Sequence, residues 1–228
     1  MKNIKTFGLL LLAVGLMNCK SGDKKTTNTT TDTTATPTKT GDVPDARYIV
    51  TEQSFGLVPL DATYETILRT FGKEKVTDEE MYRAPDSDEK VMKTIINKNK
   101  IDEIIIQWDD SLFHKKIISI EAYRENHPYK TATGIRYGTT LAELVNINGA
   151  KISFSGFGWD FGGLLSDFHG GKLAYKDGKP NITYGVDIRV TQQYDEIMGD
   201  QMIDTDMPKA KKFLQNIIVN KIDLSPAF

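Results

Sequence analysis

The chain has little of several things that often define a function: it holds one cysteine and three histidines in 228 residues, and no excess of positive charge. One cysteine excludes a disulfide-stabilised scaffold and a cysteine-rich zinc module. The 29 Lys and Arg residues are balanced by 31 Asp and Glu residues, so the positive surface that a nucleic-acid-binding protein needs is missing. We therefore expect no nucleic acid partner and no metal site.

Long hydrophobic runs are also scarce, and the clearest one lies near the N-terminus. Lys2 and Lys5 precede the apolar residues 7–17, and Lys20 follows them, which is the pattern of an export signal. A helix over this run would rise only about 16 Å, about half of a ~30 Å hydrocarbon core. We therefore expect residues 1–18 to be a lipoprotein signal peptide that is removed, not a membrane span.

The cysteine stands directly after this run. Residues 16–19 read Leu-Met-Asn-Cys and resemble a bacterial lipobox, whose cysteine is acylated and becomes the new N-terminus. The alternatives are an ordinary secretory signal or a buried cysteine. Two or three acyl chains on Cys19 would hold the protein firmly to a lipid bilayer, because each buried methylene contributes about 0.8 kcal/mol. The expected location is the outer membrane of a bacterium, on its periplasmic or surface side.

A threonine-rich segment follows the cysteine. Residues 20–46 contain ten threonines and one large apolar residue, Val43, so they cannot bury enough surface to offset the entropy of ordering. We expect Cys19 and this disordered tether, residues 19–46, to precede one globular domain at residues 47–228. Asp32-Thr33-Thr34 also resembles an O-glycosylation acceptor of Bacteroidota, with a plain solvated spacer as the alternative.

An internal repeat with an offset of 77 residues indicates how the domain is built. Residues 57–68 align with residues 134–145, and each copy predicts a short strand, a turn and a short helix. In the second copy Thr140-x-x-Glu143 predicts a capping box at the helix start. Thr63 has the same place in the first copy but lacks the glutamate, so its cap is expected to be weaker.

Glycines end both predicted helices, and β-rich runs follow them. Gly72 and Gly149 can adopt the left-handed conformation that terminates a helix. The expected later elements are strands at 91–97, 101–108, 116–123, 151–157, 159–168, 172–175, 182–190 and 217–222, and a helix at 208–215 capped by Asp204 or Asp206. The predicted fold is α+β, with two related helix-plus-antiparallel-meander units at about 50–130 and 131–222 packed as one domain.

Three segments in the middle of the chain carry a family resemblance. Residues 105–110 read IIQWDD, residues 133–144 read TGIRYGTTLAEL, and residues 156–163 read GFGWDFGG. Over about residues 90–175 they resemble a family of uncharacterised exported proteins and lipoproteins common in Bacteroidota. In outline the repeat also resembles the units of the β-lactamase-inhibitor-protein fold and of the small lipoprotein of outer-membrane barrel assembly. These resemblances imply an exported location and an interaction function, and leave the ligand open.

The glycine-rich motif at residues 156–163 is the most informative local feature. If it is extended, its aromatic side chains lie on one face and its glycines lie with Asp160 on the other. A flat ligand or a partner chain could then rest on glycines such as Gly158, beside Asp160, with Trp159 on the opposite, aromatic face. Alternatively a helix docks on the glycines and the aromatic side chains form core, in which case Asp160 needs a buried partner.

Signatures of enzymes are missing from the sequence. It has no Gly-x-Ser-x-Gly elbow, no His-Glu-x-x-His helix, no phosphate loop and no dinucleotide fingerprint. We therefore expect no catalytic residues and no cofactor. Asp167 and His169 share a strand face and could offer two metal ligands, but a polar hairpin end explains them as well. Asp200, Asp204 and Asp206 lack the spacing and the glycine of a calcium loop.

Two functions of different class remain. The first is a non-catalytic envelope lipoprotein that binds a protein or a glycan of the cell envelope through Trp108, Gly158, Trp159 and Asp160. The second is a hydrolase or carbohydrate-binding protein that uses Asp160, Asp167, His169, Trp108 and Trp159. In the second, the aromatic and acidic residues of Trp108-Asp109-Asp110 could contact a sugar, although a strand that ends in a turn has the same composition.

The membrane anchor can be tested directly. We expect Cys19→Ala to move the protein out of the washed membrane fraction, because no acyl chain can then be attached. Alkaline washing followed by immunoblotting of membrane and soluble fractions measures this, with Ser21→Ala as the control. A Cys19→Ala protein that still sediments with membranes contradicts the lipidation.

Overall fold

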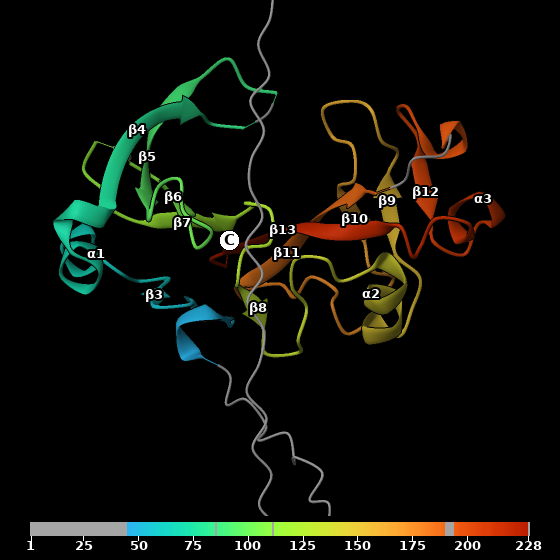
Figure 1. Ribbon diagram of the computed structural model, residues 1–228, viewed down its shortest axis with the longest axis horizontal. Coiled ribbons are helices and arrows are strands. Elements are labelled where there is room, and N and C mark those ends of the chain that lie inside the picture. The colour runs from blue at the N-terminus through green and yellow to red at the C-terminus, as the bar shows by residue number, and fades with distance from the viewer. Residues whose placement is uncertain (1–44, 85, 111, 190–193, 228) are drawn as a thin grey trace, which may run out of the picture. The chain divides into compact units, whose positions relative to one another are not determined.

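Antiparallel strands make up most of the regular secondary structure, and short helices pack against them (Figure 1). The computed structural model describes residues 45–84, 86–110, 112–189 and 194–227, which belong to one unit at 43–228. The predicted signal peptide, Cys19 and Asp32-Thr33-Thr34 lie outside the described residues. Within the described ranges, no helix has the length and hydropathy needed to cross a bilayer.

The elements follow in this order. They are the 3-10 helix Ala46–Tyr48, β1 (Ile49–Val50), β2 (Ser54–Phe55), β3 (Val58–Pro59), α1 (Tyr64–Phe71), the 3-10 helix Lys73–Lys75, β4 (Val76–Tyr82), β5 (Lys90–Ile96), β6 (Ile104–Trp108), β7 (Ile117–Ala122), β8 (Lys130–Thr131), α2 (Leu141–Asn148), β9 (Ser153–Ser155), β10 (Leu165–Asp167), β11 (Asn181–Ile188), the 3-10 helix Asp195–Ile197, β12 (Met202–Asp204), α3 (Pro208–Lys211) and β13 (Ile217–Ser225).

The largest sheet has six strands in the order β11-β13-β7-β6-β5-β4, and all of its neighbours are antiparallel. β5, β6 and β7 lie where strands were predicted. β7 from the first half of the chain pairs with β13 from the second half, with Ala122 opposite Ile222 and Glu121 opposite Asp223. This pairing joins both halves in one sheet.

Two smaller sheets flank it. One has the order β10-β9-β12, and a bridge between Leu164 and Gly185 links its β10 end to β11. The other has the order β3-β2-β1-β8, in which β1 and β8 run parallel. The structure therefore has a mixed α and β fold dominated by antiparallel strands, in agreement with the predicted class.

One hydrophobic core lies on a single face of the large sheet. It takes Ile67 from α1 and Leu141 and Leu144 from α2, together with strand residues such as Ile106 and Ile222. In Figure 1, α1, β3, β8 and α2 accordingly lie on the same side of the sheet. Short helices gain most of their stability from such packing, because helices of eight residues are unstable alone in water.

The predicted ends of the two repeated helices are confirmed in position, but Gly72 follows α1 with φ of 86° and ψ of 139°, outside the predicted left-handed helical conformation. α1 and α2 have equal lengths and are separated by the predicted 77 residues. Thr140 and Glu143 form the capping box at the start of α2, and Gly149 ends it in the left-handed conformation with φ of 77°. Thr63 Oγ1 accepts the amide of Thr66 at 3.2 Å and lies 3.0 Å from Thr66 Oγ1, but its cap lacks the return bond from a glutamate, so the cap of α1 has fewer hydrogen bonds.

The predictions of strands at 159–168 and 172–175 are largely wrong. Gly158 and Gly163 have φ of 86° and 76°, so the motif bends into a turn and extended structure resumes only at β10. Residues 172–175 form turns because the amides of Lys172 and Leu173 are bound by the carbonyl and the side chain of Asn148. These donors are therefore unavailable to a strand ladder.

Other elements differ from the prediction: β1, β2, β4 and β12 were not predicted, and α3 is shorter than expected. The edge strand β4 was not predicted, because its acidic residues have low strand propensity. α3 covers only Pro208–Lys211 and its N-cap residue is Met207, without a side-chain cap. The predicted cap, Asp204, instead belongs to β12, where its carboxylate binds the side chains of Lys151 and Ser153.

Candidate functional site

Trp108 lies in the core, not at a binding surface. Its side chain is 1% exposed, and its Nε1 donates to Thr94 Oγ1 at 2.9 Å. Thr94 Oγ1 donates to one oxygen of Asp78 at 2.7 Å, and the hydroxyl of Tyr64 donates to the other at 2.8 Å. The ring of His114 stacks on Tyr64 with centroids 4.0 Å apart. Trp108 therefore helps to fix α1 on the sheet and has no face open to a ligand.

Gly158, Trp159 and Asp160 stay together in the turn of the glycine motif. Trp159 Nε1 donates to the carbonyl of Gly156 at 2.6 Å, and its ring meets Phe161 edge-on at 5.3 Å. Asp160 is exposed, so the expectation of a buried partner for its carboxylate does not hold. The turn thus presents an aromatic pair and a carboxylate to solvent.

The turn lies beside the edge of the large sheet. The amide of Val186 donates to the carbonyl of Gly163 at 3.2 Å, and Leu164 bridges to Gly185. A Cβ on Gly185 would contact Lys221, so Gly185 shares a face of the sheet with that lysine. The motif is consequently placed next to the charged face of the sheet described below.

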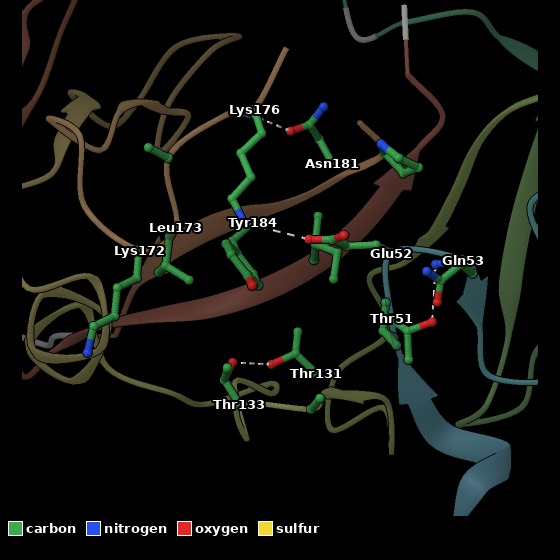
Figure 2. Close-up of a pocket in the computed structure, with 15 residues that line it drawn as sticks. Thr51, Glu52, Gln53, Thr131, Thr133, Lys172, Leu173, Lys176, Asn181 and Tyr184 are labelled. Atoms are coloured by element: carbon green, nitrogen blue, oxygen red, sulfur yellow. Dashed lines mark hydrogen bonds and ion pairs between the residues drawn. The ribbon is translucent and has the colours of Figure 1, made fainter. Parts of the chain in front are cut away.

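A pocket of about 420 Å³ opens on the core side of β11 (Figure 2). Its walls come from four segments that are distant in sequence, at 50–53, 131–133, 172–176 and 180–184. Sequence analysis missed this pocket, because only the tertiary fold brings the four segments together.

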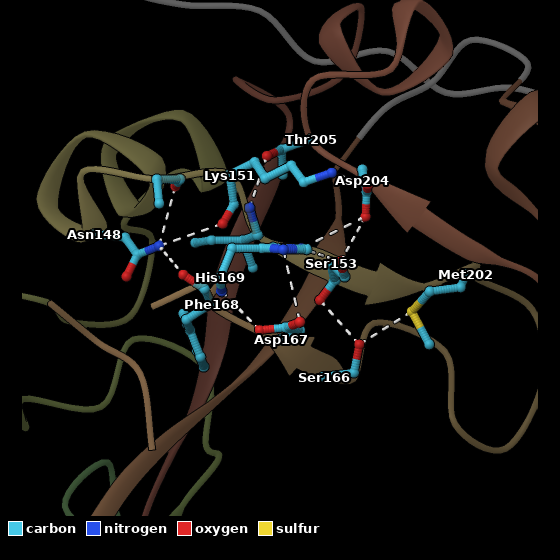
Figure 3. A network of polar contacts seen from close by, with 12 residues as sticks. Asn148, Lys151, Ser153, Ser166, Asp167, Phe168, His169, Met202, Asp204 and Thr205 are labelled. Atoms are coloured by element: carbon cyan, nitrogen blue, oxygen red, sulfur yellow. Dashed lines mark hydrogen bonds and ion pairs between the residues drawn. The ribbon is translucent and has the colours of Figure 1, made fainter. Parts of the chain in front are cut away.

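The structure brings Asp167 and His169 together with Asp204, which the sequence suggested only as a helix cap, and with Lys151 and Ser153, which the sequence did not single out (Figure 3). His169 Nε2 lies 2.7 Å from Ser153 Oγ, and its Nδ1 lies 3.7 Å from Asp167 Oδ2. Ser153 Oγ donates to Asp204 Oδ1 at 2.5 Å, and Lys151 Nζ donates to Asp204 Oδ2 at 2.5 Å. Ser153 lies opposite both Asp167 and Asp204 on the sheet β10-β9-β12, so the network spans its three strands.

The hydrogen bonds of this network link the three strands of the small sheet. Hydrogen bonds from Lys151 and, to a smaller extent, from Ser153 hold the pKa of Asp204 below its usual value. Asp204 is therefore ionised, and its carboxylate accepts the hydrogen bond that the Ser153 hydroxyl donates. The 3.7 Å between His169 and Asp167 is too long for the hydrogen bond that orients a catalytic histidine. Among the described residues no group of His, Cys, Asp and Glu could hold a metal ion, and Asp160 makes none of these contacts.

In the part of the chain that the structure describes, α1, α2 and α3 all direct buried side chains into the core, and the other face of the large sheet carries Ile95 and Ile105, which are 4% and 2% exposed. Directly opposite residues share a face of a sheet, so the register places Ile95, Ile105, Glu121 and Asp223 in one row on this side. We call this surface the open face; its central side chains are Lys93, Ile105, Gln107, Glu121, Lys221 and Asp223.

The charges of the open face lie unusually deep. Lys93 is 7% exposed, and burial lowers its pKa. Lys221 and Glu121 form an ion pair, and Glu121 and Asp223 outweigh the effect of burial on Lys221, so that its pKa is raised. Burial raises the pKa of Asp223 to about 6, although Ser225 Oγ donates to it at 2.8 Å. These four charged groups form one partly buried cluster.

A sequence signal for the open face existed. Charged residues alternate with apolar ones in β7 and β13, where Glu121 and Lys221 are flanked by buried side chains such as Ala122 and Ile222. This period of two indicates a strand with one polar face. The pattern does not show that strands from the two halves are neighbours, and the cluster exists only because they are.

Comparison of the chain with protein-family models, curated proteins and solved structures finds no match. The open face, the turn and the network therefore have to be interpreted from their own geometry.

The pKa of Asp223 predicts a pH dependence of stability. Its folded-state value of about 6 exceeds its ordinary value of 3.8, so its protonated form stabilises the folded state, and this stabilisation is lost as pH rises through 6. Between pH 5 and pH 7.5 this one group lowers the free energy of unfolding by about 1 kcal/mol. We expect Asp223→Asn to remove that part of the pH dependence in urea unfolding. An unchanged pH dependence contradicts the assignment, and Asp160→Asn serves as the exposed control.

Proposed function

We propose that this protein is an exported lipoprotein, anchored in the outer membrane through acylated Cys19, whose folded domain is a non-catalytic binding module. A threonine-rich tether at residues 19–46 holds the domain away from the bilayer, and its partner is a protein or a glycan of the cell envelope. The resemblance of residues 90–175 to exported proteins and lipoproteins of Bacteroidota supports this location. Neither a nucleic acid nor a cofactor is part of the proposal.

The observation that carries the binding function is the charged cluster of the open face. A solvent-facing side of an antiparallel sheet is common, but its charges are normally exposed. Here Lys93 and Asp223 are held in environments that disfavour their charged forms. Clusters of perturbed charged groups are concentrated at functional sites, since burying charge without a functional use only reduces stability.

The glycine-rich turn extends this surface. Trp159 and Asp160 lie on the turn that abuts β11 beside Gly185, at the edge of the open face. An aromatic pair next to a cluster of both charge signs fits a partner with mixed apolar and polar groups, because aromatic side chains dominate the energy of many interfaces.

We further infer that the domain arose from two related units. α1 is followed by β4, β5, β6 and β7, and α2 is followed by β9, β10, β11, β12 and β13, with α3 inserted before β13. The last strands of the two sets, β7 and β13, are antiparallel neighbours in the middle of the sheet. This arrangement supports the outline resemblance to the helix-plus-meander units of the β-lactamase-inhibitor-protein fold.

Site-specific photo-crosslinking in intact cells tests the binding surface. With a photoreactive residue at Gln107 or at Asp160, we expect a defined adduct with an envelope component, because both positions lie on or beside the open face. The same residue at Glu143, on the exposed side of α2, should give none. Equal adducts at all three positions, or adducts only at Glu143, contradict the proposal. Reversing one charge with Lys221→Glu should reduce the Gln107 adduct, because it breaks the cluster.

One observation favours the second function, a hydrolase that uses Asp167 and His169. Ser153, His169 and Asp167 follow one another in the order of a serine-hydrolase triad, with 2.7 Å between the serine and the histidine. Three features count against it. Ser153 is 5% or less exposed, and its hydroxyl donates to Asp204. The carboxylate of Asp167 is also beyond hydrogen-bonding distance of the His169 ring.

A fluorophosphonate probe distinguishes the two functions. We expect no adduct at Ser153, because its hydroxyl donates its hydrogen bond to Asp204, whereas a catalytic serine donates to the histidine that removes its proton. Intact-protein mass spectrometry followed by peptide mapping measures the adduct, with the exposed Ser166 as the internal control. An adduct at Ser153 that disappears in His169→Ala would establish the hydrolase and overturn the non-catalytic assignment.

A further inference from the structure

The pocket beside β11 is a site apart from the open face. Tyr184 and Ile182 line it from the core side of β11, whereas Thr183, opposite Asp223, faces the other side of the same strand. Its volume of about 420 Å³ falls within the ~300–1,000 Å³ typical of small-molecule sites.

Asn148, the last residue of α2, holds one wall in place. Its side chain donates to the carbonyl of Phe168 at 2.9 Å and accepts the amide of Leu173 at 3.0 Å, while its own carbonyl accepts the amide of Lys172 at 2.8 Å. A Cβ on Gly171 would overlap the Asn148 side chain, so only glycine fits there. This wall is therefore formed before any ligand arrives, which reduces the entropic cost of binding.

The opposite wall is the turn between β1 and β2. The amide of Thr51 donates to the carbonyl of Ser54 at 2.9 Å, and the amide of Gln53 donates to Thr51 Oγ1 at 3.2 Å. β1 is also paired with β8, with Val50 opposite Thr131. Both walls are thus fixed by backbone hydrogen bonds.

The interior of the pocket is neutral and partly apolar. Leu173 and Ile182 supply aliphatic surface, and Tyr184 supplies a hydroxyl. Burial raises the pKa of Tyr184, so this hydroxyl stays protonated at neutral pH. A ligand that enters must therefore place apolar surface inside.

The charges are gathered at the mouth. Lys176 Nζ and Glu52 Oε1 are 3.8 Å apart, and Figure 2 shows both side chains directed to the same place above Tyr184. At this distance the pair is not hydrogen-bonded, so each group can still bind a ligand atom. The ammonium group of Lys172 points away from the pair (Figure 2).

We propose that this pocket binds a free α-amino acid with an apolar side chain. The carboxylate of the ligand lies against Lys176, its ammonium group lies against Glu52, and its side chain packs on Leu173 and Ile182. A ligand with a single charge would be attracted by one of these two side chains and repelled by the other. An amino acid carries an ammonium group and a carboxylate on the same carbon, so it can pair with both.

Titration of isotope-labelled protein with four leucine derivatives tests the proposal. Leucine, N-acetyl-leucine, leucinamide and N-acetyl-leucinamide have the same side chain and differ in which charges they carry. We expect leucine to bind most tightly and to shift the amide signals of Leu173, Ala174 and Thr131 in heteronuclear NMR spectra. N-acetyl-leucinamide should bind most weakly.

Two variants identify the role of each charge. Lys176→Gln should weaken leucine and N-acetyl-leucine about three- to tenfold, the effect of one partly exposed ion pair, and leave leucinamide unchanged. Glu52→Gln should weaken leucine and leucinamide to a similar extent, with Lys179→Gln as the control. Tighter binding of leucine by Glu52→Gln, equal affinities for all four derivatives, or shifts confined to residues outside the pocket would overturn the proposal, as would no shift at the solubility limit of leucine.

Discussion

The antiparallel pairing of β7 with β13 is the constraint on which the rest of the structure depends. It places Ile120 and Ala122 opposite Leu224 and Ile222, and these four side chains enter the single core. Because side chains alternate along a strand, the same register turns Glu121 and Asp223 to the opposite face. A slip of one residue in β13 would turn that strand over, burying Asp223 in the core and exposing Ile222 and Leu224. Core and charged face are therefore two consequences of one register.

This arrangement explains why the charges of the open face cost folding free energy. Its lysines and carboxylates lie close enough to alter one another's pKa values, and Lys93 and Asp223 are in surroundings that disfavour their charges. A partner that supplies complementary groups would relieve this cost, since a buried charge is stabilised only when it is paired and hydrogen-bonded. The glycine-rich turn adds Trp159 at the edge of the same surface, where its side chain is anchored by a hydrogen bond from its indole nitrogen.

The end of α2 has a comparable role on the other side of the sheet. Asn148 binds three segments at once, so the pocket wall at residues 172–176 and the turn that carries His169 both depend on one buried amide. The polar network around Ser153 then links β10, β9 and β12. Ser153, His169 and Asp167 follow one another in space in the order of a catalytic triad. The Ser153 hydroxyl, however, donates its hydrogen bond to Asp204. A cluster of hydrolase-like residues can thus serve the packing of three short strands.

The sequence by itself determined several local features: the positions of α1 and α2, the caps of α2, and the strands β5, β6 and β7. Their causes lie within a few residues, such as the capping pair Thr140 and Glu143 or the left-handed Gly149. Tertiary structure alone decided which residues form a site. The segment Trp108-Asp109-Asp110 had a composition that suits sugar binding, but Trp108 lies in the core. Thr94 on the neighbouring strand accepts the hydrogen bond that its indole N–H donates. The glycine motif turns instead of extending, β4 forms although its acidic residues disfavour strands, and Glu121 meets Asp223 across 102 positions of sequence. Such contacts depend on strand order and register, which local propensity does not encode.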